Sequence, residues 1–160
     1  MVQKMFKKYV LKSVFMLSSI SIFIALSSCR KDDEEPTQDG NHYKITYTLN
    51  DVNPSDDFVS LAIAGSTSDP SVKTIWKVNG VEQPNQNGLG FGDDDFAGAT
   101  KTYVIETIRP LLVMNAGGQI INYGQDLSFT IKIEKNGKVE INEEKTLTGD
   151  GSNWNKTFNF

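Results

Sequence analysis

The chain has 160 residues, of which 16 are Lys or Arg, 20 are Asp or Glu, one is Cys and one is His. This length allows one domain with processing segments. The lone Cys excludes an internal disulfide framework and multi-cysteine zinc sites, and the lone His excludes His-rich metal sites. The net charge of −4 argues against nucleic acid as the main partner.

Residues 1–28 are typical of an export signal. The segment contains four lysines and no acid, and the stretch 13–28 is uncharged and rich in apolar residues. A basic start followed by a short apolar stretch is the layout of a secretory signal peptide. The stretch is shorter than the roughly 20 apolar residues of a transmembrane helix and is diluted by serines. We therefore expect residues 1–28 to be removed on export.

The only cysteine of the chain directly follows this segment. In Leu26-Ser27-Ser28-Cys29, a branched aliphatic residue and two small residues precede a thiol. This pattern resembles the lipobox of bacterial lipoproteins. The resemblance implies cleavage before Cys29 and acylation of its thiol, with palmitate as a typical acyl group. One acyl chain anchors a protein only marginally, but the several chains that the resemblance implies anchor it permanently.

The segment 29–41 is polar and strongly charged, so we expect a disordered tether after the lipid site. A lysine followed by a run of acids directly after the lipidated Cys resembles the export signal of Bacteroidota surface lipoproteins. The residues that carry this resemblance are Lys31, Asp32, Asp33, Glu34 and Glu35. It implies a location in the outer membrane with the domain facing the outside, and the periplasmic leaflet is the alternative.

The mature chain is more acidic than the full chain. Without residues 1–28 it has 12 bases and 20 acids, and so a net charge of −8. Such a surface is repelled by phosphates and by anionic lipids. The charge therefore predicts no nucleic-acid partner, and the resemblance to lipoproteins implies that the outer membrane is contacted through the lipid anchor.

From residue 42 onward, apolar residues alternate with polar ones, which predicts β-strands. We expect strands at 43–49, 58–64, 74–78, 81–83, 101–109, 126–135, 138–147 and 154–160. Asn79-Gly80 and Asn136-Gly137 predict hairpin turns of type I′, because both residue types tolerate positive φ. The stretch 110–123, interrupted by Gly117-Gly118, is expected to be irregular, and 85–99 is expected to be a long Gly-rich loop.

Many short strands separated by turn signals favour an all-β fold. We expect residues 42–160 to form an immunoglobulin-like β-sandwich of about seven to nine antiparallel strands, with Trp76 in its core. A jelly roll and a closed barrel are the alternatives.

Catalysis has little support in the sequence. The only histidine, His42, lies where the tether meets the first predicted strand, so a Ser or Cys nucleophile has no evident base. The acids fall mainly in loops and at strand ends. We expect no enzymatic activity and no catalytic residue.

Calcium is the one cofactor that the sequence suggests. Asp93, Asp94 and Asp95 lie within the Gly-rich segment 85–99, and calcium prefers carboxylate, amide and carbonyl oxygens. A second acidic segment, 51–57, begins like a calcium loop but lacks Gly at the sixth position and Glu at the twelfth, which excludes an EF-hand. Solubilising loop acids are the alternative interpretation of both segments.

Aromatic residues suggest a ligand-binding surface, because a flat ring can stack on a sugar. The candidates are Phe91, Phe96 and Trp154, with Tyr103 and Tyr123 beside them. Loops on a rigid sandwich often carry binding sites, but core packing is the alternative for each ring. 

The sequence therefore predicts a non-enzymatic, lipid-anchored surface protein that presents a β-sandwich for binding or structural interaction. One alternative is a carbohydrate-binding accessory lipoprotein of a glycan-uptake system. Another is an adhesin or assembly subunit that pairs its edge strands with a partner.

Overall fold

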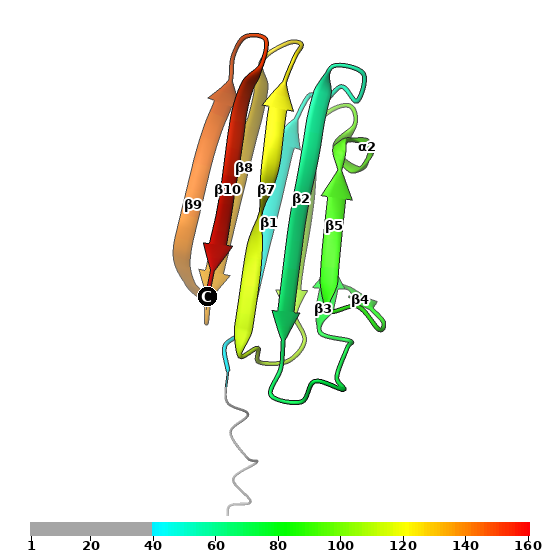
Figure 1. Cartoon of the computed structure of the whole chain (residues 1–160), viewed down its shortest axis with the longest axis vertical. Helices are drawn as coiled ribbons and strands as arrows, with labels where there is room; N and C mark the ends of the chain where they lie inside the picture. The colour runs from blue at the N-terminus through cyan, green and yellow to red at the C-terminus, as the bar shows by residue number, and fades with distance from the viewer. Residues whose placement is uncertain (1–39) are drawn as a thin grey trace, which may run out of the picture. The chain divides into compact units, whose positions relative to one another are not determined.

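Two antiparallel sheets make up residues 40–160, the part of the chain that the computed structural model describes (Figure 1). The predicted signal peptide, the lipidation site Cys29 and the export residues Lys31 to Glu35 lie outside this part. Within residues 40–160, no helix has the length and hydropathy that a membrane crossing requires.

The larger sheet has six strands in the order β4-β3-β6-β1-β8-β9. Their bounds are β1 Tyr43–Asn50, β3 Trp76–Val78, β4 Val81–Gln83, β6 Lys101–Thr107, β8 Leu127–Lys135 and β9 Lys138–Leu147. The smaller sheet has four strands in the order β10-β7-β2-β5. Their bounds are β2 Asp57–Ser66, β5 Gly88–Gly92, β7 Val113–Asn122 and β10 Ser152–Asn159. One short helix, α2 (Asp93–Phe96), follows β5.

The structure confirms the predicted all-β sandwich. The number of strands is ten rather than seven to nine, because β5 lies in the expected loop and β7 lies in the segment expected to be irregular. In immunoglobulin domains the first two strands lie in the same sheet. Here β1 and β2 lie in different sheets, so the likeness is one of architecture, two packed antiparallel sheets, rather than of strand order.

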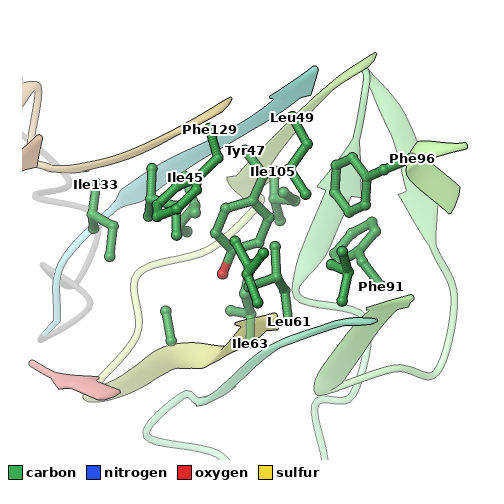
Figure 2. Packing of buried hydrophobic residues seen from close by; sticks show 14 of the residues in the cluster. Ile45, Tyr47, Leu49, Leu61, Ile63, Phe91, Phe96, Ile105, Phe129 and Ile133 are labelled. Atoms are coloured by element: carbon green, nitrogen blue, oxygen red, sulfur yellow. The ribbon is translucent and has the colours of Figure 1, made fainter. Parts of the chain in front are cut away.

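The core forms between the two sheets from alternate residues of each strand. Ile45 and Tyr47 of the larger sheet and Leu61 and Ile63 of the smaller one are almost fully buried and point toward each other (Figure 2). Trp76 is also fully buried, as predicted. The apolar period of two thus identifies the inward face of each long strand.

Both predicted hairpin turns are present. Asn79 and Gly80 have φ values of 49° and 82°, and Asn136 and Gly137 have φ values of 51° and 78°. Positive φ at both central residues is the signature of the type I′ turn, whose twist matches that of the flanking strands.

The segment expected to be irregular is in fact the regular strand β7. Gly117 and Gly118 do not interrupt it, because they allow close approach of the strands on either side. A Cβ on Gly117 would lie 2.8 Å from Thr157 Cα, and one on Gly118 would lie 2.8 Å from Leu61 Cα. The glycines that resemble a breaker in the sequence are thus a packing requirement of the sheet.

Candidate functional site

Aspartates gather at one end of the sandwich. The strand pairs Asn50–Ser128, Asp57–Asn122 and Ser60–Gly92 show that four chain connections meet at this end, the upper end in Figure 1. Eight of the nine aspartates of residues 40–160 lie in these connections or, for Asp57, at the first position of β2. They are Asp51, Asp56, Asp57, Asp93, Asp94, Asp95, Asp126 and Asp150. We call this region the aspartate-rich end.

The loop before β2 is organised around Asn53. Its carbonyl accepts hydrogen bonds from the backbone N–H groups of Asp56 and Asp57, at 2.9 and 2.7 Å. Its own N–H donates to Asp57 Oδ2 at 2.9 Å, and its Nδ2 donates to Asp56 Oδ2 at 2.6 Å. One amide residue therefore holds two neighbouring carboxylates in fixed positions.

Asp57 is the unusual member of this loop. Its residue is only 8% exposed, since it occupies an inward position at the start of β2. Within the described residues, its Oδ1 is buried and has no hydrogen-bond partner. Burial of a carboxylate oxygen without a partner costs free energy, because the oxygen loses water and gains nothing in exchange.

The loop lies beside the chain that follows α2. The N–H of Gly98 donates to the carbonyl of Val52 at 2.9 Å, and Val52 also pairs with Ala97. Together the two segments line an open depression of about 430 Å³, whose walls include Asp51, Asn53 and backbone of Gly98. Two acidic segments that are 40 residues apart in the chain thus share one end of the fold.

The predicted metal ligands Asp93, Asp94 and Asp95 form most of α2 rather than a Gly-rich loop. Asp95 Oδ2 accepts a hydrogen bond of 2.7 Å from the N–H of Gly92 and so caps the helix. Within residues 40–160, no three Asp, Glu, His or Cys side chains lie close enough together to hold one ion. The structure gives these three aspartates a local structural role and leaves their role in calcium binding a prediction.

The predicted ligand-binding aromatics are in the core, which corrects the expectation that their faces are exposed. Phe91 is 8% exposed and Phe96 is fully buried, and both rings point inward (Figure 2). Phe91 contacts Tyr103 at a ring-centroid distance of 4.9 Å, and Phe96 contacts the same ring at 5.1 Å. The loop that was expected to display the two phenylalanines is β5 and α2, whose inward positions they occupy.

Tyr103 joins this aromatic cluster to the aspartate-rich end. Its hydroxyl donates to the carbonyl of Asp95 at 3.1 Å. Burial, with a smaller effect from the negative charge of Asp95, raises the pKa of Tyr103 above its ordinary value. The cluster thus fixes α2 against the sandwich.

Trp154 is buried as well, at 4% exposure, and it closes the opposite edge of the sandwich. Its ring packs on Phe129 at 5.5 Å between centroids, and its Nε1 donates to Glu143 Oε2 at 2.8 Å. Lys156 forms an ion pair with the same carboxylate. Trp154 therefore links β10 to β9 and is not available for stacking on a sugar.

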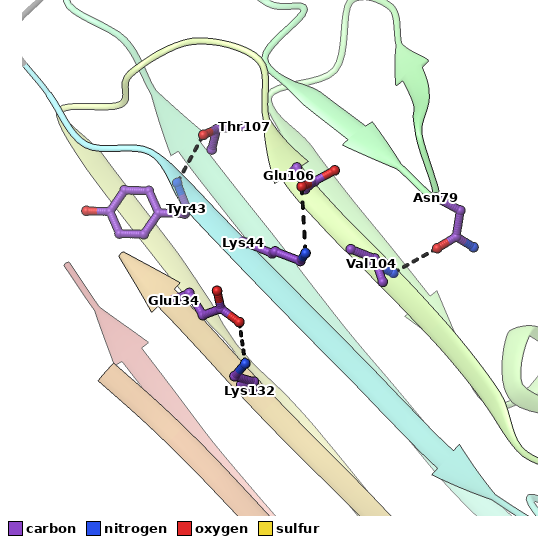
Figure 3. A network of polar contacts seen from close by, with 8 residues as sticks. All are labelled: Tyr43, Lys44, Asn79, Val104, Glu106, Thr107, Lys132 and Glu134. Atoms are coloured by element: carbon purple, nitrogen blue, oxygen red, sulfur yellow. Dashed lines mark hydrogen bonds and ion pairs between the residues drawn. The ribbon is translucent and has the colours of Figure 1, made fainter. Parts of the chain in front are cut away.

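His42 lies far from the aspartate-rich end. Its Nδ1 is 3.2 Å from the hydroxyl of Thr107, which also accepts a hydrogen bond from the N–H of Tyr43 (Figure 3). The histidine thus helps to hold the start of β1 against β6. Its surroundings are those of a strand end.

Comparison with known proteins identifies the fold. No protein-family model and no curated protein matches the sequence. Among solved structures, the fold is similar to that of a DUF4425 family protein from Bacteroides ovatus, with a TM-score of 0.53 and 14% identity over 76% of this chain and 94% of that one. A DUF4425 domain from Bacteroides vulgatus is similar to the same degree, with a TM-score of 0.53 and 18% identity over 75% and 93% of the two chains.

A third similar structure is the calcium-bound form of a protein from Parabacteroides distasonis, determined by NMR. Its TM-score is 0.55, with 16% identity over 79% of this chain and 98% of that one. At these identities the likeness establishes a shared fold.

The sequence missed Asp57 as a candidate ligand. Its segment, 51–57, lacks the EF-hand pattern, in which ligands follow one another along a single loop. In a sandwich, ligands come from separate connections that the sheet register brings together. The available signal is that most aspartates lie in alternate connections between strands. In an antiparallel fold, alternate connections lie at the same end.

Proposed function

We propose that the protein is a non-enzymatic, lipid-anchored surface protein whose β-sandwich binds calcium at the aspartate-rich end. The observation that carries the calcium proposal is the buried and unpartnered Oδ1 of Asp57, in a loop that already positions Asp56. A cation beside this oxygen compensates the cost of its burial. Calcium binding thereby ties the connections at this end to one another.

The available donors fit a hard cation. Calcium takes six to eight oxygens from carboxylates, amides, backbone carbonyls and water. Asp57 and Asp56 supply carboxylates, Asn53 lies beside both, and the backbone of Tyr123 and Gly124 in the next connection lies against Asp56. The end holds no His or Cys in its connections, so the donor set does not suit zinc. The calcium-bound form of the Parabacteroides distasonis protein supports the same cation for this fold.

Support for the lipid anchor comes from the sequence. Cys29 closes a lipobox-like pattern, and Lys31 to Glu35 resemble the signal that exports lipoproteins to the outer face of the outer membrane. The absence of an evident catalytic base is the basis for proposing that the protein binds rather than catalyses.

Calcium binding predicts a rise in thermal stability. A ligand at 100 times its dissociation constant stabilises the folded state by about 2.7 kcal/mol, which for a domain of this size raises Tm by roughly 8 °C or more. We expect this rise for the wild type in differential scanning calorimetry with calcium against EDTA. In Asp57→Asn, which keeps the shape of the side chain and removes its charge, we expect the rise to fall by at least half.

Asp69→Asn is the matched control. Asp69 is the one aspartate of residues 40–160 outside the aspartate-rich end, and its carboxylate bonds only to Ser71. The control should show the full calcium-dependent rise. An equal rise in Asp57→Asn and the wild type, or none in the wild type, would refute the proposed site.

A further inference from the structure

The outer face of the smaller sheet carries no charged side chain. Along β2 the outward residues after Phe58 are only Ser and Ala, and those of β5 are three glycines. The outward residues of β7 and β10 are small, amide, hydroxyl or aliphatic. The two charged residues of this sheet, Asp57 and Lys156, occupy the inward face. The face is therefore neutral over its whole area.

The opposite face of the sandwich is different. It carries the pair Lys44–Glu106, with 3.9 Å between Nζ and Oε1, and the pair Lys132–Glu134 (Figure 3). Residues 42–160 contain 10 bases and 15 acids, so a neutral face is a departure from the rest of the surface. Outward charges usually keep sheets soluble and apart. The absence of charged side chains from the outer face of the smaller sheet therefore favours a neutral binding partner on that face.

A shallow trough lies on this face over the middle of β2 and β7 and reaches Thr157 of β10. Small residues form its floor, because Ala62 pairs with Gly117 and Gly117 pairs with Thr157. The trough has a volume of about 310 Å³. With neighbouring strands about 4.8 Å apart, the three strands beneath the trough span about 10 Å from the first to the third, which is the length of a short oligosaccharide.

Amide side chains occupy the outward rows on both sides of the floor, and one of them, Asn115, also lines the trough. Asn115 and Asn159 pair with each other in the next row toward one end, and Gln119 and Asn155 pair in the next row toward the other. Each carboxamide offers two donors and one acceptor oxygen without charge. Hydroxyl groups on both edges of a sugar ring need such partners, while the flat floor accepts the apolar face of the ring.

We propose that this amide-bordered trough binds a neutral glycan. Charge favours this occupant, since a polyanion is repelled by a domain of net charge −5 and a polycation finds no carboxylate on the face. A protein partner is less well matched, because protein interfaces depend on buried aromatic and Arg anchors, which the trough lacks. The trough lies in the middle of the sheet face, so the inference does not depend on calcium at the aspartate-rich end.

Affinity electrophoresis in native gels tests the proposal. The gels contain the neutral polysaccharides xyloglucan, galactomannan, dextran or glycogen, or the anionic polygalacturonate as a contrast. We expect the wild type to be retarded by at least one neutral polysaccharide, in EDTA as in calcium, and not by polygalacturonate. Ala62→Lys should weaken this binding at least tenfold by filling the floor with a long charged side chain. Gln119→Ala combined with Asn155→Ala should weaken it without adding charge.

Thr46→Lys is the matched control, since it places the same lysine at an outward position of the larger sheet. It should bind like the wild type, and all variants should keep the circular dichroism spectrum of the wild type. Retardation by no neutral polysaccharide, or equal retardation of Ala62→Lys, overturns the proposal. A wild-type dimer in sedimentation that Ala62→Lys converts to a monomer, without glycan binding, also overturns it and assigns the face to self-association.

Discussion

At the scale of single residues, position in the sheet decides what a polar side chain does. Asp57 and Glu143 both occupy inward positions near an edge or end of the sandwich, and their surroundings differ. Glu143 accepts hydrogen bonds from Trp154 and Lys156, whereas Asp57 Oδ1 has no partner among the described residues. The first carboxylate is a structural link, and the second is the feature that points to a cation.

Glu143 predicts a pH dependence of stability. Burial raises its pKa, but hydrogen bonds from Lys156 and Trp154 outweigh this effect, so the pKa lies below the ordinary value of 4.5. A carboxyl whose pKa is lowered by folding stabilises the folded state above its ordinary pKa and loses this effect as the pH falls through its folded pKa. Because Lys156 is half-exposed, we expect Glu143→Gln to cost only about 1 kcal/mol at pH 7.

Urea denaturation at several pH values measures this difference. The wild type and Glu143→Gln should approach equal free energies of unfolding as the pH is lowered below 4.5. A difference that stays constant from pH 7 to pH 3 would mean that the charge of Glu143 contributes nothing.

At the scale of elements, β7 is the strand on which the smaller sheet depends. It pairs with β2 along ten positions and with β10 along eight. Gly118 has a φ of 152°, and its backbone lies against that of Ser60 and Leu61. The strand can therefore join its two neighbours only with glycine at this position.

Gly118→Ala should destabilise the domain by about 2–4 kcal/mol, because the new Cβ forces β2 and β7 apart. Gly90→Ala is the control, since a Cβ there would come no nearer than 4.0 Å to the backbone of Leu61. We expect the control to change the free energy of unfolding, measured by chemical denaturation, by less than about 0.5 kcal/mol. Similar losses in the two variants would contradict the packing role of Gly118.

At the scale of the whole molecule, charge is sorted by location. Aspartates concentrate at one end, all six glutamates of residues 40–160 lie in the larger sheet, and the outer face of the smaller sheet is neutral. The proposed calcium site and the proposed glycan trough thus occupy separate parts of the domain.

The proposed anchor is tested on intact cells. Cys29→Ala should remove acylation, so the protein should lose incorporation of a palmitate analogue and leave the membrane fraction. Replacement of Asp32, Asp33, Glu34 and Glu35 by Ala should keep the acylation but protect the protein from protease added outside the cells. An acylated wild type that protease does not reach would place the domain on the periplasmic side.

Much of the fold was predictable because strand formation depends on local alternation of apolar and polar residues. The tips of both hairpins followed from Asn-Gly pairs, and the burial of Trp76 followed from the expected core. The strand β7 and the helix α2 were missed, since Gly117-Gly118 and the Gly-rich segment 85–99 have no local pattern that separates a packed strand from a loop. Phe91, Phe96 and Trp154 were misjudged for a similar reason, because exposure depends on which face of a strand meets the other sheet.

The sequence by itself determined the all-β class and the inward face of most strands, because both depend on residues close together in the chain, and it is the basis of the proposed export signal around Cys29. Only the tertiary structure decided which connections share an end and which rows of side chains share a face. The aspartate-rich end and the amide-bordered trough both depend on sheet register, which joins residues 36 or more positions apart. A local turn fixes the register within a hairpin, but the register between strands far apart in the chain depends on which faces are buried when the two sheets pack.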